Sequence, residues 1–282
     1  MKLASYQLGG EPSFGIVTDD GLIDLPKRID RGVDLKAALD LAGGVGAFRQ
    51  FENDKPDFAK HDVAFLPVIP KPDKIMCIGL NYRDHAEETG ADIPKYPTIF
   101  VRFANSQVGH LNPIMRPQVS TKYDYEGELA VVIGRPAQHV SRDTALDYVA
   151  GYTCFNDGTV LDWQGHTSQF TAGKNFFQSG AMGPWLTTPD EVGDPGQLGL
   201  ITRLNGEVVQ QGSTADLLFD VAALIAYIST FTQLRPGDVI ATGTPAGVGY
   251  RRRPPRYLRA GDVVEIEIEK VGLLRNPVGD EG

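Results

Sequence analysis

DYEGELAVVIGR, residues 124–135, is the most informative segment of this sequence. Glu126 and Glu128 stand two residues apart, directly ahead of the apolar run from Leu129 to Ile133. The valines and isoleucine of that run favour a strand, and residues two apart on a strand point to the same face. The segment therefore predicts a buried strand with two carboxylates on one face at its start. An edge strand with solvent-exposed acids would carry the same pattern.

A third acid strengthens the prediction of a metal site. Asp157 closes the strand-like run GYTCFND, where a second strand could end beside the first. Close carboxylates repel one another unless one is protonated or a cation lies between them. Three carboxylates with water complete an octahedral oxygen site that suits Mg²⁺, Mn²⁺ or Ca²⁺ better than Zn²⁺. The alternative is that Asn156, Asp157 and Gly158 only form a turn.

Composition describes an ordinary globular protein. The chain has 282 residues, with 32 Gly, 19 Pro and a net charge of −9, which argues against binding to a nucleic acid backbone. The cysteines, Cys77 and Cys154, lack the CxxC spacing and indicate a reduced, cytoplasmic protein. The N-terminus has no apolar segment typical of a signal peptide, and no apolar run approaches membrane-spanning length, so no membrane association is expected.

The chain divides at a proline-rich segment. Residues 1–25 are typical of short strands, and residues 34–51 carry a weak helical pattern. PVIPKPD, residues 67–73, can continue neither a helix nor a central strand. We therefore predict a small N-terminal β-rich domain at 1–70 and a catalytic domain at 71–282.

The second part of the chain is predicted to be rich in strands with few helices. Its expected strands are KIMCIGL, TIFVRF, the run after residue 126, the run ending at Asp157, and the alternating GDVVEIEIEKVG. Its expected helices are NYRDHAEETG, ended by Gly90, a segment capped by Ser141, and residues 220–231, begun by Asp220. Because strands and helices do not alternate regularly, we expect a mixed β-rich α+β roll and not a Rossmann sheet.

Two further groups are candidates for catalysis. His85 and Glu88 stand three apart, so on a helix Glu88 could hold the imidazole in the tautomer that a general base needs. Lys174 lies in a loop rich in glycine and phenylalanine, where a partly desolvated ammonium could stabilise an oxyanion. The alternatives are a solvated helix face for the first pair and an ordinary surface lysine for the second.

The loop TGTPAGVG, residues 242–249, offers hydroxyls and backbone N–H groups that could cradle a carboxylate, with Gly243 and Thr244 at its start. It lacks the GK[ST] of a phosphate-binding P-loop. The basic cluster RRRPPR, residues 251–256, is typical of a solvated loop and could also draw anions toward a nearby pocket.

The order of these segments resembles the fumarylacetoacetate hydrolase family over residues 70 to 282. The blocks that carry the resemblance are NYRDHAEE, DYEGELAVVIGR, GYTCFNDGTVLDWQ, GKNFFQSGAMGPW, LNGEVVQQGST, RPGDVIATGTPAGVG and GDVVEIEIEKVGLLRNPV. The resemblance implies a mixed β-roll, a homodimer, and a small N-terminal domain of the kind that many bacterial members carry.

The resemblance also implies roles for particular residues. Glu126, Glu128 and Asp157 would be the ligands of Mg²⁺ or Mn²⁺, with Ca²⁺ as an ion that could replace them in a crystal. By the same resemblance, His85 and Glu88 would form a water-activating pair on a lid. Lys174 and Gln164 would stabilise the oxyanion, and Thr244 would contact the substrate carboxylate.

Two positions depart from the family pattern. Leu161 stands where an arginine is common, and that arginine can face a substrate carboxylate. Arg102 stands where a lysine is frequent, and Phe103 replaces the proline that often follows. Arg102, Gly243 and Thr244 are the predicted substrate contacts, and the anionic end of the substrate is expected to be held differently or to be less anionic.

The reaction that the resemblance implies first is metal-dependent hydrolysis of a carbon–carbon bond in a 2,4-diketo acid, such as an acylpyruvate or fumarylpyruvate, with release of pyruvate. The same site would also suit decarboxylation of oxaloacetate, or isomerisation or hydration of an unsaturated 2-oxo acid. A homologue that binds a small 2-oxo acid without catalysis is the alternative from another class.

Overall fold

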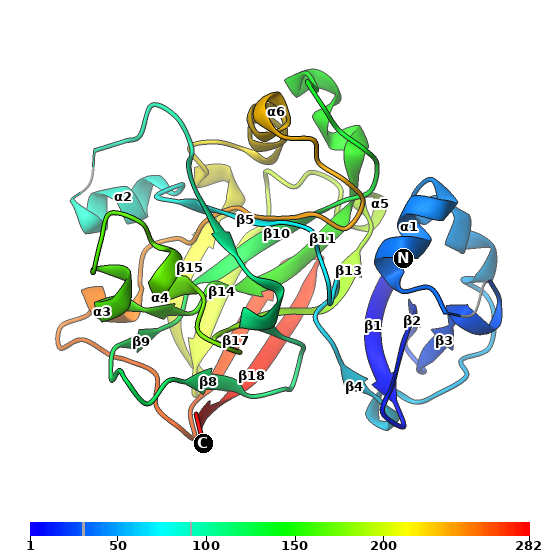
Figure 1. The fold of residues 1–282 in the computed structure, drawn as a ribbon, viewed down its shortest axis with the longest axis horizontal. Coiled ribbons are helices and arrows are strands. Elements are labelled where there is room, and N and C mark those ends of the chain that lie inside the picture. The colour runs from blue at the N-terminus through cyan, green and yellow to red at the C-terminus, as the bar shows by residue number, and fades with distance from the viewer. Residues whose placement is uncertain (30–31, 91) are drawn as a thin grey trace.

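The computed structural model describes residues 1–29, 32–90 and 92–282, in which two large β-sheets pack face to face (Figure 1). The larger sheet contains β1 (Lys2–Leu8), β2 (Glu11–Val17), β3 (Leu22–Asp24), β4 (Ala64–Phe65), β5 (Ile75–Gly79), β6 (Thr98–Arg102), β7 (Gln107–Val108), β10 (Gly127–Ile133), β11 (Val149–Asn156), β13 (Gly180–Thr187) and β16 (Val239–Ala241). The smaller contains β8 (Ile114–Arg116), β14 (Gly199–Leu204), β15 (Glu207–Ser213), β17 (Val263–Ile268) and β18 (Gly272–Asp280).

Short elements connect and cover these sheets. β9 (Tyr123–Asp124) and β12 (Thr159–Val160) pair with each other. The α-helices of the described residues are α1 (Leu35–Ala42), α2 (Arg83–Thr89), α3 (Leu161–Gln164), α4 (Thr171–Lys174), α5 (Pro189–Val192) and α6 (Val221–Phe231). In Figure 1, α2, α3 and α4 gather at the opposite end of the molecule from α1 and β3. The strand-rich mixed α+β fold expected from the sequence is therefore confirmed.

Strand β10 lies at the centre and is buried on both faces. Leu129 and Val131 point into the core between the two sheets, where α6 also packs. Ala130 and Val132 point into a second core, which the N-terminal strands and α1 share. Because side chains alternate along a strand, Glu128 lies on the same face as Ala130. The period of two therefore places the acid at the end of a fully buried face.

The N-terminal strands extend the larger sheet. β1 pairs antiparallel with β13 through Lys2 and Leu3, and β2 and β3 follow outward in the sheet order. Leu3 and Phe14 pack in the same core as Ala130. Residues 1–70 thus share both a sheet and a core with the rest of the chain, and a domain division at residue 70 stays a prediction.

Most of the helix ends follow the expected local chemistry. The Asp220 carboxylate accepts the N–H of Ala223 and caps α6, and Gly90 ends α2 with φ +67°. The segment after Ser141 differs, because Arg142–Tyr148 forms a 3₁₀ helix and not the expected α-helix. Among the described residues, none of the helices combines the length and apolar character that crossing a bilayer requires.

Candidate metal centre

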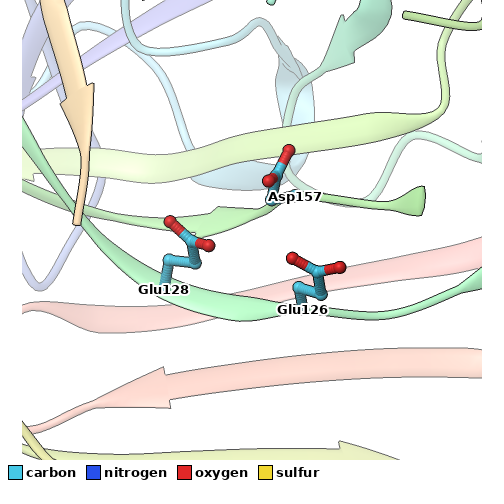
Figure 2. Close-up of side chains that lie close together, drawn as sticks. All are labelled: Glu126, Glu128 and Asp157. Atoms are coloured by element: carbon cyan, nitrogen blue, oxygen red, sulfur yellow. The ribbon is translucent and has the colours of Figure 1, made fainter. Parts of the chain in front are cut away.

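Strand pairing brings the three predicted carboxylates together (Figure 2). β10 and β11 run antiparallel with Gly127 opposite Asn156, and the N–H of Asp157 donates to the carbonyl of Glu126 at 2.9 Å. One oxygen from each of Glu126, Glu128 and Asp157 lies within 4.8 Å of the others. The pairing of two strands therefore explains how acids far apart in sequence form one cluster, as the sequence predicts.

Neighbouring groups hold two of these carboxylates in place. The N–H of Gly243 donates to Oε2 of Glu128 at 2.8 Å, and the hydroxyl of Thr159 donates to Oε1 of Glu126 at 2.7 Å. Burial, followed by the charges of Asp157 and Glu126, raises the pKa of Glu128 well above its ordinary value. A cation in the cluster would relieve this repulsion.

Lys174 is the internal counter-ion of the cluster. Its Nζ donates to Glu126 Oε2 at 2.7 Å, to Asp157 Oδ2 at 2.6 Å and to the Asp157 carbonyl at 3.2 Å. Burial acts to lower the pKa of Lys174, but the charges of Asp157 and Glu126 outweigh it and raise the pKa overall. An ammonium has three N–H donors, and all three are used here. The structure thus brings Lys174 to the acids, whereas the sequence suggested a donor facing the substrate.

Arg102 lies behind Asp157. Its side chain is fully buried and donates to Asp157 Oδ1 at 2.6 Å, to the Gly158 carbonyl at 2.9 Å and to the Ser179 hydroxyl at 3.0 Å. It is not among the residues that line the neighbouring cavity. The structure thus gives Arg102 the position of a residue that holds Asp157, and it does not bring the guanidinium to the substrate side as the sequence interpretation expected.

The charges and donor atoms of the cluster fit a divalent cation. Three carboxylates face two cations, Lys174 and Arg102, so the cluster has one net negative charge when all three acids are ionised, as binding of a cation requires. A carboxylate-only donor set is typical of hard cations such as Mg²⁺ and Mn²⁺. Glu126, Glu128 and Asp157 therefore form a divalent metal site.

A cavity of about 420 Å³ opens over the cluster, within the range of small-molecule sites. Its lining combines the acid cluster and Lys174 with apolar, aromatic and uncharged polar residues. The lining residues are Ile78, Gly79, Leu80, His85, Phe100, Glu126, Glu128, Asp157, Leu161, Gln164, Gly165, Thr167, Phe170, Lys174, Thr244 and Tyr250. The cavity thus collects the predicted catalytic residues except Glu88, and the predicted contacts Arg102 and Gly243 lie outside its lining.

Helix α2 carries the His85–Glu88 pair to this cavity. His85 Nδ1 lies 3.2 Å from Glu88 Oε2, as the i,i+3 spacing predicts. The other Glu88 oxygen accepts the N–H of Gly247 at 3.1 Å, and Asp84 accepts the N–H of Ala246 at 3.3 Å. Two carboxylates on α2 therefore tie this helix directly to the glycine-rich loop.

Helices α3 and α4 meet closely because residue 173 is a glycine. A Cβ at Gly173 would lie 2.5 Å from the backbone nitrogen of Gln164. This close contact sets Gln164 and Lys174 side by side on the cavity wall. Thr244 also lines the cavity, but its hydroxyl donates to the Gly127 carbonyl at 2.9 Å and accepts from Gln210 at 2.8 Å. The Thr244 hydroxyl thus stabilises the start of β10.

Asp124 is a site residue that sequence analysis missed. It is fully buried and accepts the N–H groups of Gly249 at 2.9 Å and Tyr250 at 2.8 Å, which holds Tyr250 at the cavity. Burial raises the pKa of Asp124 to about 7, against the opposing effect of these N–H groups. The available signal was the spacing of Asp124, Glu126 and Glu128, which continues the same period of two.

Comparison with known proteins identifies relatives along the whole chain. Residues 74–279 match the family model described as fumarylacetoacetate (FAA) hydrolase, C-terminal. The chain is 39% identical over 288 residues to a mitochondrial oxaloacetate tautomerase of Xenopus laevis, an alignment that covers 99% of this chain and 90% of the relative. Both the family model and this relative therefore cover well over half of the sequence.

Solved structures agree over the full length. A fumarylacetoacetate hydrolase from Exiguobacterium antarcticum superposes with a TM-score of 0.88 at 33% identity and covers 100% of both chains. Maleylpyruvate hydrolase from Sphingobium sp. SYK-6, in complex with a manganese(II) ion and pyruvate, gives a TM-score of 0.83 at 28% identity, again with 100% of both chains covered. The manganese-bound neighbour agrees with a divalent metal site in this fold.

Proposed function

The chain belongs to the fumarylacetoacetate hydrolase family, and we propose that it catalyses keto–enol tautomerisation of a small 2-oxo acid, with Mg²⁺ or Mn²⁺ as its cofactor. At a coarser level, it is a metal-dependent enzyme of this family that acts on oxo acids. The full-length relative named as an oxaloacetate tautomerase supports the choice of tautomerisation over other reactions.

The observation that carries the proposal is the acid cluster at the floor of a small cavity. Glu126, Glu128 and Asp157 would hold the ion, and a 2-oxo acid would enter from the cavity above them. When bound, the ion supplies positive charge that lowers the free energy of a developing enolate. The buried, water-poor surroundings of these residues strengthen that effect.

Tautomerisation has a simple proton balance. One proton leaves C3 of the substrate for a solvent water molecule, one proton arrives at the C2 oxygen from solvent, and no water is consumed overall. The buried charge of Lys174 stabilises the enolate through space, without needing a hydrogen bond to it. The His85–Glu88 pair, which would be required to deprotonate an attacking water, is dispensable for this reaction.

Hydrolysis of an acylpyruvate is the second candidate. It is supported by His85, which lines the same cavity with Glu88 at 3.2 Å from its Nδ1, and by the neighbour named as a maleylpyruvate hydrolase. In that reaction His85 would draw a proton from water, and Gln164 on the cavity wall would donate to the tetrahedral oxyanion. The sequence interpretation favoured this reaction, whereas the oxaloacetate tautomerase relative favours the first.

One assay separates the two. Purified protein with Mn²⁺ is mixed with enol-oxaloacetate, and the loss of the enol absorbance is followed beside a metal-free control. A parallel reaction with acetylpyruvate is analysed for pyruvate and acetate. We expect faster enol loss with no bond cleavage. Pyruvate and acetate release without enhanced tautomerisation would instead select the hydrolase.

We also propose that the chain forms a homodimer. β6 is at one end of the larger sheet, and the exposed apolar side chains of Val101, Phe103 and Phe177 lie on or near it. An edge strand with apolar side chains is a suitable surface for a second copy. Light scattering of the purified chain is expected to give twice the mass of 30.6 kDa, and the variant Phe103→Lys is expected to lower it.

A further inference from the structure

We propose that the cavity selects 2-oxo acids whose distal end is uncharged, and that Leu161 is the specificity-determining residue. The substrate class thus includes 2-oxo acids with a ketone or alkyl group at C4, in preference to dicarboxylates such as oxaloacetate itself. This inference rests on the proposed function only in requiring that a 2-oxo acid binds over the acid cluster.

The cations at the cavity are already committed to the acid cluster. Lys174 uses its three donors on Glu126 and Asp157. Arg102 lies behind Asp157 with its side chain fully buried, outside the cavity lining. A second substrate carboxylate would have to break one of these buried ion pairs in order to gain a cationic partner.

The remaining ionisable groups near the cavity do not supply net positive charge to its interior. His85 is paired with the Glu88 carboxylate, so its protonated form would already have a counter-ion. Arg251 lies against the ring of Tyr250, 5.0 Å from its centre, and does not line the cavity. Among the described lining residues, Lys174 is thus the one lysine or arginine.

Leu161 is one of several apolar side chains that line the cavity. Phe100 and Phe170 line the same cavity and pack edge to face with ring centres 5.6 Å apart, and Ile78 adds a further apolar side chain. The polar side chains that α3 and the following loop add are uncharged, those of Gln164 and Thr167. This wall suits a methyl, methylene or ketone group. A carboxylate against it would lose hydration without a charged partner.

The charge of the site leads to the same conclusion. With its three carboxylates ionised, the acid cluster together with Lys174 and Arg102 has one net negative charge, which a bound divalent ion would convert to one net positive charge. A substrate with one carboxylate neutralises that charge. A substrate with two carboxylates leaves one negative charge uncompensated in a largely buried site, which is unfavourable.

Acetylpyruvate and oxaloacetate provide a matched pair for the activity test. They have the same number of non-hydrogen atoms, and both can enolise between C2 and C4, but only oxaloacetate carries a second carboxylate. We expect the tautomerisation kcat/KM of the Mn²⁺-loaded protein to be at least about tenfold higher for acetylpyruvate, the effect of one unpartnered charge. A kcat/KM equal or higher for oxaloacetate would overturn the proposal.

A binding measurement tests the same preference independently of turnover. Calorimetric titration of the Mn²⁺-loaded protein with 2-oxovalerate and 2-oxoglutarate, which share a chain length, is expected to give a Kd at least about tenfold lower for 2-oxovalerate. Failure of both enol substrates to react, with this binding preference intact, would contradict the tautomerase function and leave the specificity inference standing. Tighter binding of 2-oxoglutarate would contradict the inference alone.

Substitution of Leu161 assigns the preference to that residue. Leu161→Arg adds a cation to the wall and is expected to reverse the ratio of the two Kd values, by about tenfold or more in favour of 2-oxoglutarate. Leu161→Met keeps the wall apolar at similar volume and is expected to keep the wild-type ratio. An unchanged ratio of the two Kd values in a folded Leu161→Arg protein would show that Leu161 does not determine the specificity. If this variant does not fold, Leu161→Gln, expected to reduce the ratio, serves in its place.

Discussion

The acid cluster and helix α2 face the same cavity but are held there by different kinds of contact. Glu126, Glu128 and Asp157 lie on or directly beside two paired central strands, and buried ion pairs surround them. Helix α2 is only seven residues long and is tied to the glycine-rich loop by the side chains of Asp84 and Glu88. The first region is fixed by the fold, whereas the second is held by contacts that can open without unfolding the sheet.

This difference suggests a division of work. A rigid cluster suits the binding of an ion and the stabilisation of an enolate, because both need fixed charges. A short helix joined by two carboxylate–amide contacts suits entry and exit of substrate. Substitutions should therefore reduce tautomerisation most in the cluster, less in its supporting residues, and least on α2.

The largest effect is expected from Glu128→Gln. The amide removes one ligand charge but can still accept the N–H of Gly243, so the fold should persist. We expect Mn²⁺ affinity to fall by more than the roughly 100-fold that loss of an outer-shell partner can cost, with loss of both tautomerisation and hydrolysis. Calorimetric Mn²⁺ titration measures the change. Glu87→Gln, on the exposed side of α2, is the control, and equal affinities in the two variants would refute the assigned ligand.

A smaller effect is expected from Arg102→Met. The change leaves Asp157 without one of its two cations and should weaken Mn²⁺ binding by about 10- to 100-fold. It should also lower the free energy of unfolding by about 3–5 kcal/mol, because it breaks a buried ion pair. Urea denaturation checks the stability. The exposed pair of Arg203 and Glu267 gives the control, Arg203→Met, which should cost less than about 1 kcal/mol.

The third prediction tests whether hydrolysis depends on α2 while tautomerisation depends on the acid cluster. His85→Ala should lower acylpyruvate hydrolysis by roughly 10²- to 10⁴-fold, because hydrolysis needs a base for water. It should change tautomerisation by no more than about tenfold, since no water is activated and the acid cluster is intact. Enol decay and pyruvate release are measured on the same protein. Equal losses in both activities would mean that α2 is as essential to enolisation as the cluster.

The smallest effect is expected from Asp84→Asn. The contact from Ala246 to Asp84 is long, 3.3 Å, and its weakening should cost about 1 kcal/mol locally. Hydrogen exchange of the amides in residues 83–90 should become about fivefold faster, while the amides of β10 keep their rates. Faster exchange in β10 would mean that the two regions open together.

The sequence was sufficient to predict the acid cluster because the geometry of the cluster follows from simple local rules. A period of two puts Glu126 and Glu128 on one face, and a second strand ending at Asp157 can pair beside them. Helix ends at Asp220 and Gly90 also follow from local chemistry.

The other features depend on contacts between distant parts of the chain. Lys2 pairs with Thr187, a residue far along the chain. The proline-rich segment at 67–73 therefore gives no indication that the N-terminal strands join the larger sheet. The sequence predicted that Arg102 and Lys174 contact the substrate, whereas in the structure both form ion pairs with Asp157. Local sequence patterns identify which residues are charged, whereas packing decides which partner each one meets.

The most direct test of the account is anomalous diffraction from crystals of this protein soaked in Mn²⁺. We predict one strong anomalous peak enclosed by the carboxylates of Glu126, Glu128 and Asp157, at the floor of the cavity. Absence of a peak there, or a peak only at other acidic groups on the surface, would contradict the metal centre and the enol chemistry proposed for it.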